Sequence, residues 1–154
     1  MMPATNSPRG MPVVAALQVL VDLRTDDTIV VTNQASARIW PQLQRHSLDV
    51  HYNPSTMGGA VPLALGLALA QPGRQVMAIS GDGALLMSLG SLVTVVGAGA
   101  SNLTVVVLEN NMYEVTGGQK MAASQTPLDW PALARWPQAS SRRWVARCGW
   151  RNPP

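Results

Sequence analysis

One segment of the sequence carries residues whose types and spacing suit the binding of a metal ion and a phosphate. Gly81-Asp82-Gly83 stands between two apolar runs, and Asn110 follows the next apolar run, 28 positions after Asp82. Asp82 offers a carboxylate oxygen and Asn110 an amide oxygen, and Mg²⁺ prefers such oxygens together with phosphate and water. The small residues beside Asp82 let a phosphate approach the backbone closely. The segment therefore predicts a site for a magnesium-bound diphosphate.

Short apolar strands alternating with helices are expected to position these residues. We predict four strands, at Thr28–Asn33, Asp49–Tyr52, Gln75–Ser80 and Leu103–Leu108. We predict five helices, at Met11–Leu23, Ser36–Leu43, Ala60–Gln71, Ala84–Val96 and Asp129–Arg135. This alternation is typical of a three-layer α/β/α fold with a mainly parallel sheet. Because ligands bind at the carboxyl ends of such strands, Asp82 and Asn110 are expected to meet there.

Composition narrows the class of protein. The 154 residues are 47% hydrophobic and 12% charged, which is typical of one globular domain. Cys148 is the single cysteine, so a disulfide framework and a cysteine metal site are excluded within one chain. The apolar stretches Ala60–Ala70 and Ala84–Ala98 are too short and too interrupted to span a membrane. Residues 1–11 lack a signal pattern, and we expect a cytoplasmic protein.

Three segments are expected along the chain: a loose leader at 1–11, the binding domain at 12–135 and an irregular basic tail at 136–154. Up to residue 134 the chain has six basic and eight acidic side chains, whereas residues 135–154 have five arginines and no acid. Short basic tails can bind nucleic acid or anionic lipid. Nothing else in the chain supports such binding, so neither a nucleic acid nor a membrane is expected as partner.

The two polar motifs, each placed after a strand, resemble the signature of thiamine diphosphate enzymes. The resemblance extends over Thr28–Pro127 and includes the loop Pro54–Ala60. Gly81–Gly90 and Glu109–Gln119 are similar to the two-subunit 2-oxoacid decarboxylases, with sulfopyruvate decarboxylase β subunits and phosphonopyruvate decarboxylases as the nearest types. The resemblance implies the thiamine diphosphate-binding fold and the cofactors thiamine diphosphate and Mg²⁺.

Carried over by position, the resemblance implies three magnesium ligands: the side chains of Asp82 and Asn110 and the carbonyl of Met112. An alignment shifted by one residue gives Asn111 and Tyr113 instead. The implied cofactor-binding set is Met57, Gly58, Gly81, Asp82, Gly83, Ala84, Asn110, Met112 and Tyr113.

Within that set the roles differ. Gly83 and Ala84 would donate backbone N–H groups to the diphosphate, and Ala84 stands where the family often has Ser. Met57 would lie under the cofactor and hold its bent shape. The alternative for Met57 is an ordinary core methionine that fills a gap.

The resemblance also implies an activating Glu on a separate pyrimidine-binding domain. Glu109 and Glu114 are the only Glu residues of the sequence, and both lie in the predicted magnesium loop. We therefore expect no catalytic residue in this chain, which would be the β-type subunit of a 2-oxoacid decarboxylase, inactive without an α subunit. His46 is expected to be a solvated residue at a helix end, and His51 either a structural residue or one that approaches the substrate.

Two other functions stay open. The β subunits of 2-oxoacid:ferredoxin oxidoreductases also carry a stretch like Thr116–Gln119, although cysteines for iron–sulfur clusters are absent from the sequence. A catalytically silent remnant is the second alternative, and the tail Trp136–Pro154, which departs from the family, is its main support. This tail is either a truncated or frame-shifted end or a lineage-specific terminus. Loss of a strand and helix would expose an unpaired sheet edge.

Overall fold

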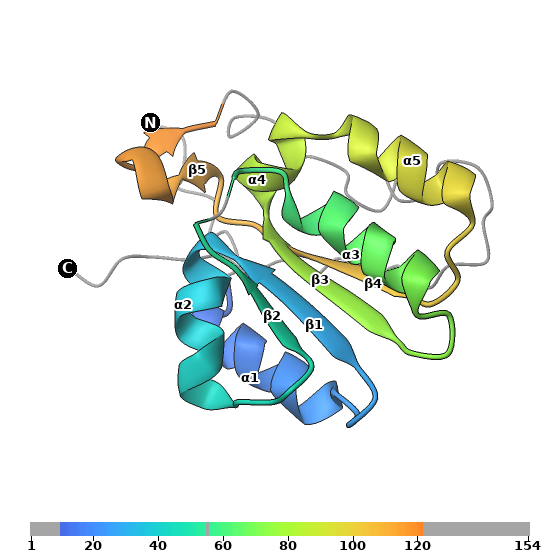
Figure 1. Ribbon diagram of the computed structural model, residues 1–154. Coiled ribbons are helices and arrows are strands. Elements are labelled where there is room, and N and C mark those ends of the chain that lie inside the picture. The colour runs from blue at the N-terminus through green and yellow to red at the C-terminus, as the bar shows by residue number, and fades with distance from the viewer. Residues whose placement is uncertain (1–9, 55, 122–154) are drawn as a thin grey trace, which may run out of the picture.

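The structure, a computed structural model, describes residues 10–54 and 56–121 (Figure 1). The helices are α1 (Val13–Leu23), α2 (Gln34–Leu43), α3 (Ala60–Ala70), α4 (Asp82–Met87) and α5 (Gly90–Ala98), with a 3₁₀ turn η1 (Glu114–Thr116). The strands are β1 (Ile29–Asn33), β2 (Asp49–Tyr52), β3 (Val76–Gly81), β4 (Leu103–Leu108), β5 (Met112–Tyr113) and β6 (Gln119–Lys120).

Four parallel strands form the central sheet in the order β2-β1-β3-β4. Val31 of β1 pairs with Val50 of β2 and with Ala78 of β3, and Ala78 pairs with Val105 of β4. Strands β5 and β6 form a separate antiparallel hairpin. Because β1, β3 and β4 run the same way, the residues that follow them lie at one edge of the sheet.

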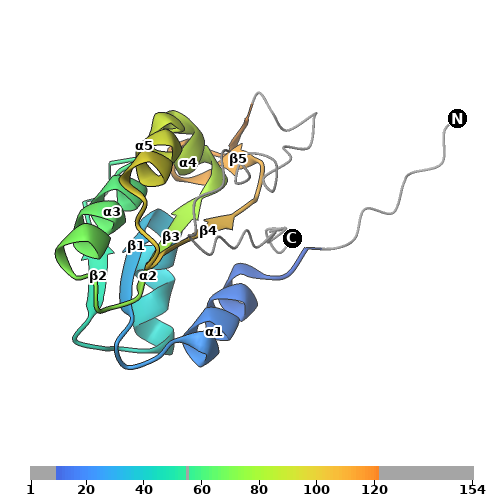
Figure 2. The same ribbon diagram turned by 90° about the vertical axis from the view of Figure 1, so that its right-hand side faces the viewer.

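Helices cover both faces of the sheet, which gives the predicted three layers (Figure 2). On one face, Leu17 of α1 and Trp40 of α2 are fully buried against Val30, Ile79 and Val106. On the other face, α3 and α5 pack on the alternate side chains of the same strands. The strands are apolar on both sides because both faces are covered.

The predicted strands and the first three helices are confirmed to within two residues. The prediction of one helix at Ala84–Val96 is wrong, because the structure has α4 and α5 with a break at Ser88. Serine and glycine stabilise helices weakly, and Ser88 here leaves helical geometry. The β5–β6 hairpin had no predicted counterpart. Residues 1–9, the helix predicted at Asp129–Arg135, the tail and Cys148 lie outside the described residues.

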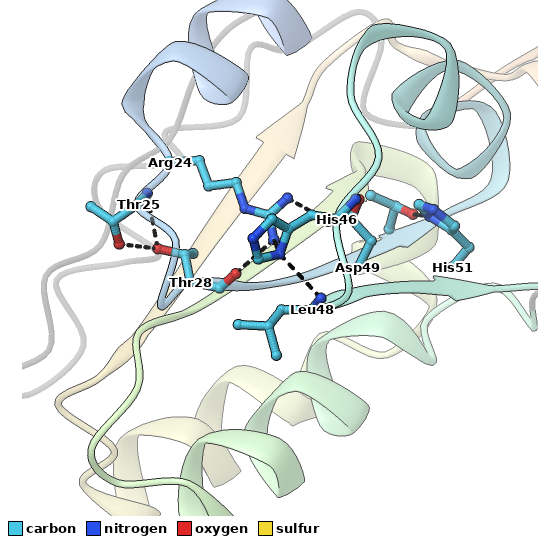
Figure 3. Close-up of polar contacts among 8 residues, drawn as sticks. Arg24, Thr25, Thr28, His46, Leu48, Asp49 and His51 are labelled. Atoms are coloured by element: carbon cyan, nitrogen blue, oxygen red, sulfur yellow. Dashed lines mark hydrogen bonds and ion pairs between the residues drawn. The ribbon is translucent and has the colours of Figure 1, made fainter.

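A buried ion pair joins α1 to β2 at the amino end of the strands (Figure 3). Arg24 Nη1 donates to Asp49 Oδ1 at 2.6 Å, and the two side chains are 2% and 4% exposed. Arg24 Nη2 contacts His46 Nδ1 at 2.8 Å and donates to the Thr28 carbonyl at 3.0 Å. The expectation of a solvated His46 is therefore wrong, since the Arg24 guanidinium holds this half-buried ring.

In the part of the chain that the structure describes, no helix has both the length and the apolar character needed to cross a membrane.

Candidate functional site

The two polar motifs meet at the carboxyl end of the sheet, as predicted. Strands β3 and β4 pair up to Gly81 and Leu108, so the residues that follow them are neighbours. Asp82 Oδ2 accepts hydrogen bonds from the backbone N–H groups of Asn110, at 2.9 Å, and Asn111, at 2.7 Å. Residues 28 positions apart are thus in direct contact.

Asp82 is a buried carboxylate that forms no ion pair with a cationic side chain among the described residues. Asp82 is 2% exposed. In addition to the two hydrogen bonds to its Oδ2, its Oδ1 accepts one from the Gly83 N–H at 2.8 Å. Among the described residues, neither of the two ion pairs involves Asp82. Burial raises the pKa of the Asp82 carboxyl; the three N–H donors act in the opposite direction, and the nearby Glu109 adds to the rise. A divalent cation would offset this burial.

The carboxylate keeps room for a metal ion. A carboxylate offers about four acceptor positions, two on each oxygen. Oδ2 accepts two hydrogen bonds and Oδ1 accepts one, so within the described part of the chain one position on Oδ1 has no donor.

The geometry separates Asn110 from Asn111. Asn111 is exposed and has a φ of 61°, in the left-handed region, and it contributes its backbone N–H to Asp82. Asn110 lines the pocket, and its Oδ1 accepts a hydrogen bond from the Met112 N–H at 3.0 Å while its Nδ2 donates to Glu114. Of these two asparagines, Asn110 lines the pocket and Asn111 does not.

A pocket with a cavity volume of about 90 Å³ opens at this edge of the sheet. Of the residues implied by the resemblance, those that line it are Met57, Gly81, Asp82, Gly83, Ala84, Asn110, Met112 and Tyr113. Gly58 is buried but does not line the pocket. Pockets that enclose whole drug-sized ligands measure about 300–1,000 Å³, so this one suits only part of a cofactor.

Gly83 is packed closely on the pocket wall. A Cβ at this position would lie 2.8 Å from ring carbons of Tyr113, so a larger residue would displace that ring. Its N–H, which the resemblance assigns to the diphosphate, donates to Asp82 in this structure.

Sequence reasoning missed the turn between β1 and α2. Asn33 lines the pocket, is 1% exposed and forms a capping box with Ser36, while its side-chain Nδ2 has no hydrogen-bond acceptor among the described residues. The next residue, Gln34, has a φ of 51°, which is strained for a residue other than glycine. The Ser36 hydroxyl closes the turn on the Asn33 backbone. Asn33 is the last residue of β1 and lies at the same carboxyl edge of the sheet as Asp82 and Asn110, so the same rule would have found it.

The histidines lie elsewhere. His51 is exposed on β2, and its Nδ1 bonds to the Thr32 hydroxyl at 2.8 Å without lining the pocket. Among the described residues, no three His, Cys, Asp or Glu side chains gather as metal ligands. A metal ion at Asp82 would therefore need amide, carbonyl and phosphate oxygens.

This pocket at a switch between parallel strands, with the buried Asp82 carboxylate and loops of small residues, is typical of a phosphate-binding α/β domain. Residues 28–135 match the family described as "Thiamine pyrophosphate enzyme, C-terminal TPP binding domain". The chain belongs to this family.

Curated relatives are similar over part of their length. The chain is 35% identical to a phosphonopyruvate decarboxylase of Streptomyces viridochromogenes, over 97% of this chain and 34% of the relative. It is 46% identical to the sulfopyruvate decarboxylase subunit beta of Methanothermobacter thermautotrophicus, over 44% of this chain and 36% of the relative. The chain thus spans about a third of the length of each.

A solved structure confirms the fold. The benzoylformate decarboxylase of Polynucleobacter necessarius superposes with a TM-score of 0.67 over 87% of this chain and 29% of that chain. The sequences are 22% identical, so this likeness concerns the fold alone.

Proposed function

We propose that this chain anchors the diphosphate and magnesium of thiamine diphosphate in a 2-oxoacid decarboxylase, and that a pyrimidine-binding partner subunit completes the active site. The observation that carries the proposal is Asp82. Its carboxylate is buried, held by three N–H donors from two loops, and has no cationic partner among the described residues. Such a group suits a divalent cation.

Asn33 gives a second, independent reason to expect a polar ligand. Buried polar side chains nearly always have hydrogen-bond partners, and an exception calls for an explanation. The Asn33 side chain lines the same pocket as Asp82, and its Nδ2 has no acceptor in the described part of the chain. A phosphate oxygen or a magnesium-bound water would satisfy it.

Each group of residues would have one task. Asp82, Asn110 and the Met112 carbonyl would hold Mg²⁺, and Asn33 with the Gly81–Ala84 backbone would face the diphosphate. Met57 would contact the ring portion and exclude water beneath it. The cofactor, when bound, supplies the electron sink that the decarboxylation of a 2-oxoacid needs. The chain's own contribution is binding, orientation and charge neutralisation.

The size of the pocket and the positions of the two Glu residues support the need for a partner. Glu109 is buried beside Asp82, and Glu114 accepts a hydrogen bond from Asn110, so both belong to the magnesium loop. The carboxylate that activates the aminopyrimidine would then come from another domain. The pocket also suits only part of the cofactor, and one relative is named as a subunit beta.

Calorimetric titration of the full chain with thiamine diphosphate and Mg²⁺ tests the proposal. Asp82→Ala is expected to weaken magnesium-dependent binding by more than about 100-fold, beyond what outer-shell substitutions cost. Asp27→Ala removes a carboxylate that is 82% exposed and serves as the matched control. Unchanged affinity in Asp82→Ala would refute the metal assignment.

The activity itself is tested with a candidate pyrimidine-domain partner added. Carbon dioxide release from a panel of 2-oxoacids, including sulfonated and phosphonated ones, is expected only with both chains present. Cofactor binding without turnover of any 2-oxoacid would refute the decarboxylase and leave a silent binding module.

A further inference from the structure

The loop that carries Met57 is a tight turn whose shape depends on glycine. The Gly59 N–H donates to the Thr56 carbonyl at 3.1 Å, and Gly58 has a φ of +88°. A positive φ at the third residue fits a type II turn, with Met57 as its second residue. The turn thus presents Met57 at its corner, where this side chain lines the pocket.

Two side chains from other elements hold this turn. The Ser88 hydroxyl donates to the Gly58 carbonyl at 2.8 Å. A Cβ on Gly58 would lie 2.7 Å from the Ser88 hydroxyl oxygen, and one on Gly59 would lie 2.5 Å from the Tyr52 ring. The turn is therefore packed between Ser88 and Tyr52 with no room for a larger residue.

Ser88 owes its position to the break between α4 and α5. Helix α4 starts at Asp82 and ends at Met87, and Ser88 leaves helical geometry with a φ of −132° and a ψ of 43°. A continuous helix would not have this bend, which places the hydroxyl on the Gly58 carbonyl. One short helix therefore links the carboxylate of the pocket to the turn that carries Met57.

We propose that Ser88 is a positioning residue: its hydrogen bond to Gly58 fixes the turn and directs Met57 into the pocket beside Asp82. This inference rests on the proposed function for the identity of the ligand. The hydrogen bond sets the position of Met57 relative to the diphosphate site, so that the diphosphate and the ring portion of one ligand can be bound together. Ser88 itself does not line the pocket.

The first test needs no ligand. Ser88→Ala is expected to speed amide hydrogen exchange at Gly58 and Gly59 about fivefold, because one hydrogen bond is lost. Ser91→Ala is the matched control, since its hydroxyl has no hydrogen-bond partner among the described residues. Ser88→Thr keeps the hydroxyl and is expected to restore slow exchange. Wild-type exchange rates in Ser88→Ala would overturn the inference.

The second test separates positioning from general stability. We expect Ser88→Ala to weaken thiamine diphosphate binding in Mg²⁺ about fivefold and to leave inorganic diphosphate binding unchanged. In a Met57→Ala background, Ser88→Ala is expected to have no further effect. Equal weakening for both ligands would overturn the inference. If the wild-type chain binds neither ligand, the proposed function fails, whereas the exchange rates still decide whether Ser88 holds the turn.

Discussion

The amino and carboxyl ends of the sheet each bury a carboxylate and an asparagine, and the two ends treat them differently. At the amino end, Asp49 pairs with Arg24, and the Asn102 amide donates to three backbone carbonyls. Among the described residues at the carboxyl end, Asp82 has only N–H donors and the Asn33 Nδ2 has no acceptor. The carboxylate and the asparagine at the amino end thus have partners within the protein, whereas among the described residues at the carboxyl end Asp82 has no cation and the Asn33 Nδ2 has no acceptor, which is why we propose a ligand there.

Substitution of the two carboxylates is expected to give the largest difference in the free energy of unfolding between the two ends of the sheet. Asp49→Ala would leave the buried Arg24 uncompensated and is expected to lower the free energy of unfolding by about 3 to 5 kcal/mol. Asp82→Ala should change it by about 1 kcal/mol or less, because lost N–H bonds and relief of carboxylate burial oppose each other. Urea unfolding of both variants measures the difference. Equal destabilisation would remove the distinction between the two ends.

Substitution of the two asparagines is expected to give a smaller difference in the free energy of unfolding, measured in the same way. Asn102→Leu leaves the carbonyls of Ala68, Gln71 and Arg74 without their shared donor, and should cost about 2 to 3 kcal/mol. Asn33→Leu removes an Nδ2 that has no acceptor to lose, together with the N-cap side chain of α2, so it should cost only about 1 kcal/mol or less. A large loss for Asn33→Leu would show that this amide serves the fold and not a ligand.

The pH dependence of stability gives the smallest effect. Burial raises the pKa of Asp82, so the folded chain binds this proton more tightly than the unfolded chain. The resulting stabilisation is complete below the unfolded pKa of about 3.9 and is lost as pH rises through the raised value. Asp82→Asn should lack this loss of stability. The difference from the wild type should be small, because the three N–H donors act against the rise in the pKa of Asp82. Parallel wild-type and Asp82→Asn unfolding curves across pH would contradict the assignment.

Much of the fold followed from apolar periodicity. The buried strand Leu103–Leu108 was predicted to the residue, and α3 ended within one residue of its predicted end, before Pro72-Gly73. The break at Ser88 was missed because Ala84–Val96 is mostly apolar, and the break is accompanied by a contact of the Ser88 hydroxyl with Gly58, 30 positions away. Local pattern carries no information about that contact.

The sequence by itself determined the α/β class, the family and the convergence of Asp82 with Asn110, because strand order and spacing place both motifs at one end of a parallel sheet. Only the tertiary structure decided which buried polar groups have a hydrogen-bond or ionic partner. It gave Asp49 a cation and left Asp82 without one among the described residues, and it placed Asn110 in the pocket in preference to Asn111. Burial and hydrogen-bond partners arise from segments distant in the chain. Buried polar groups that lack a partner can therefore be recognised only in the folded structure.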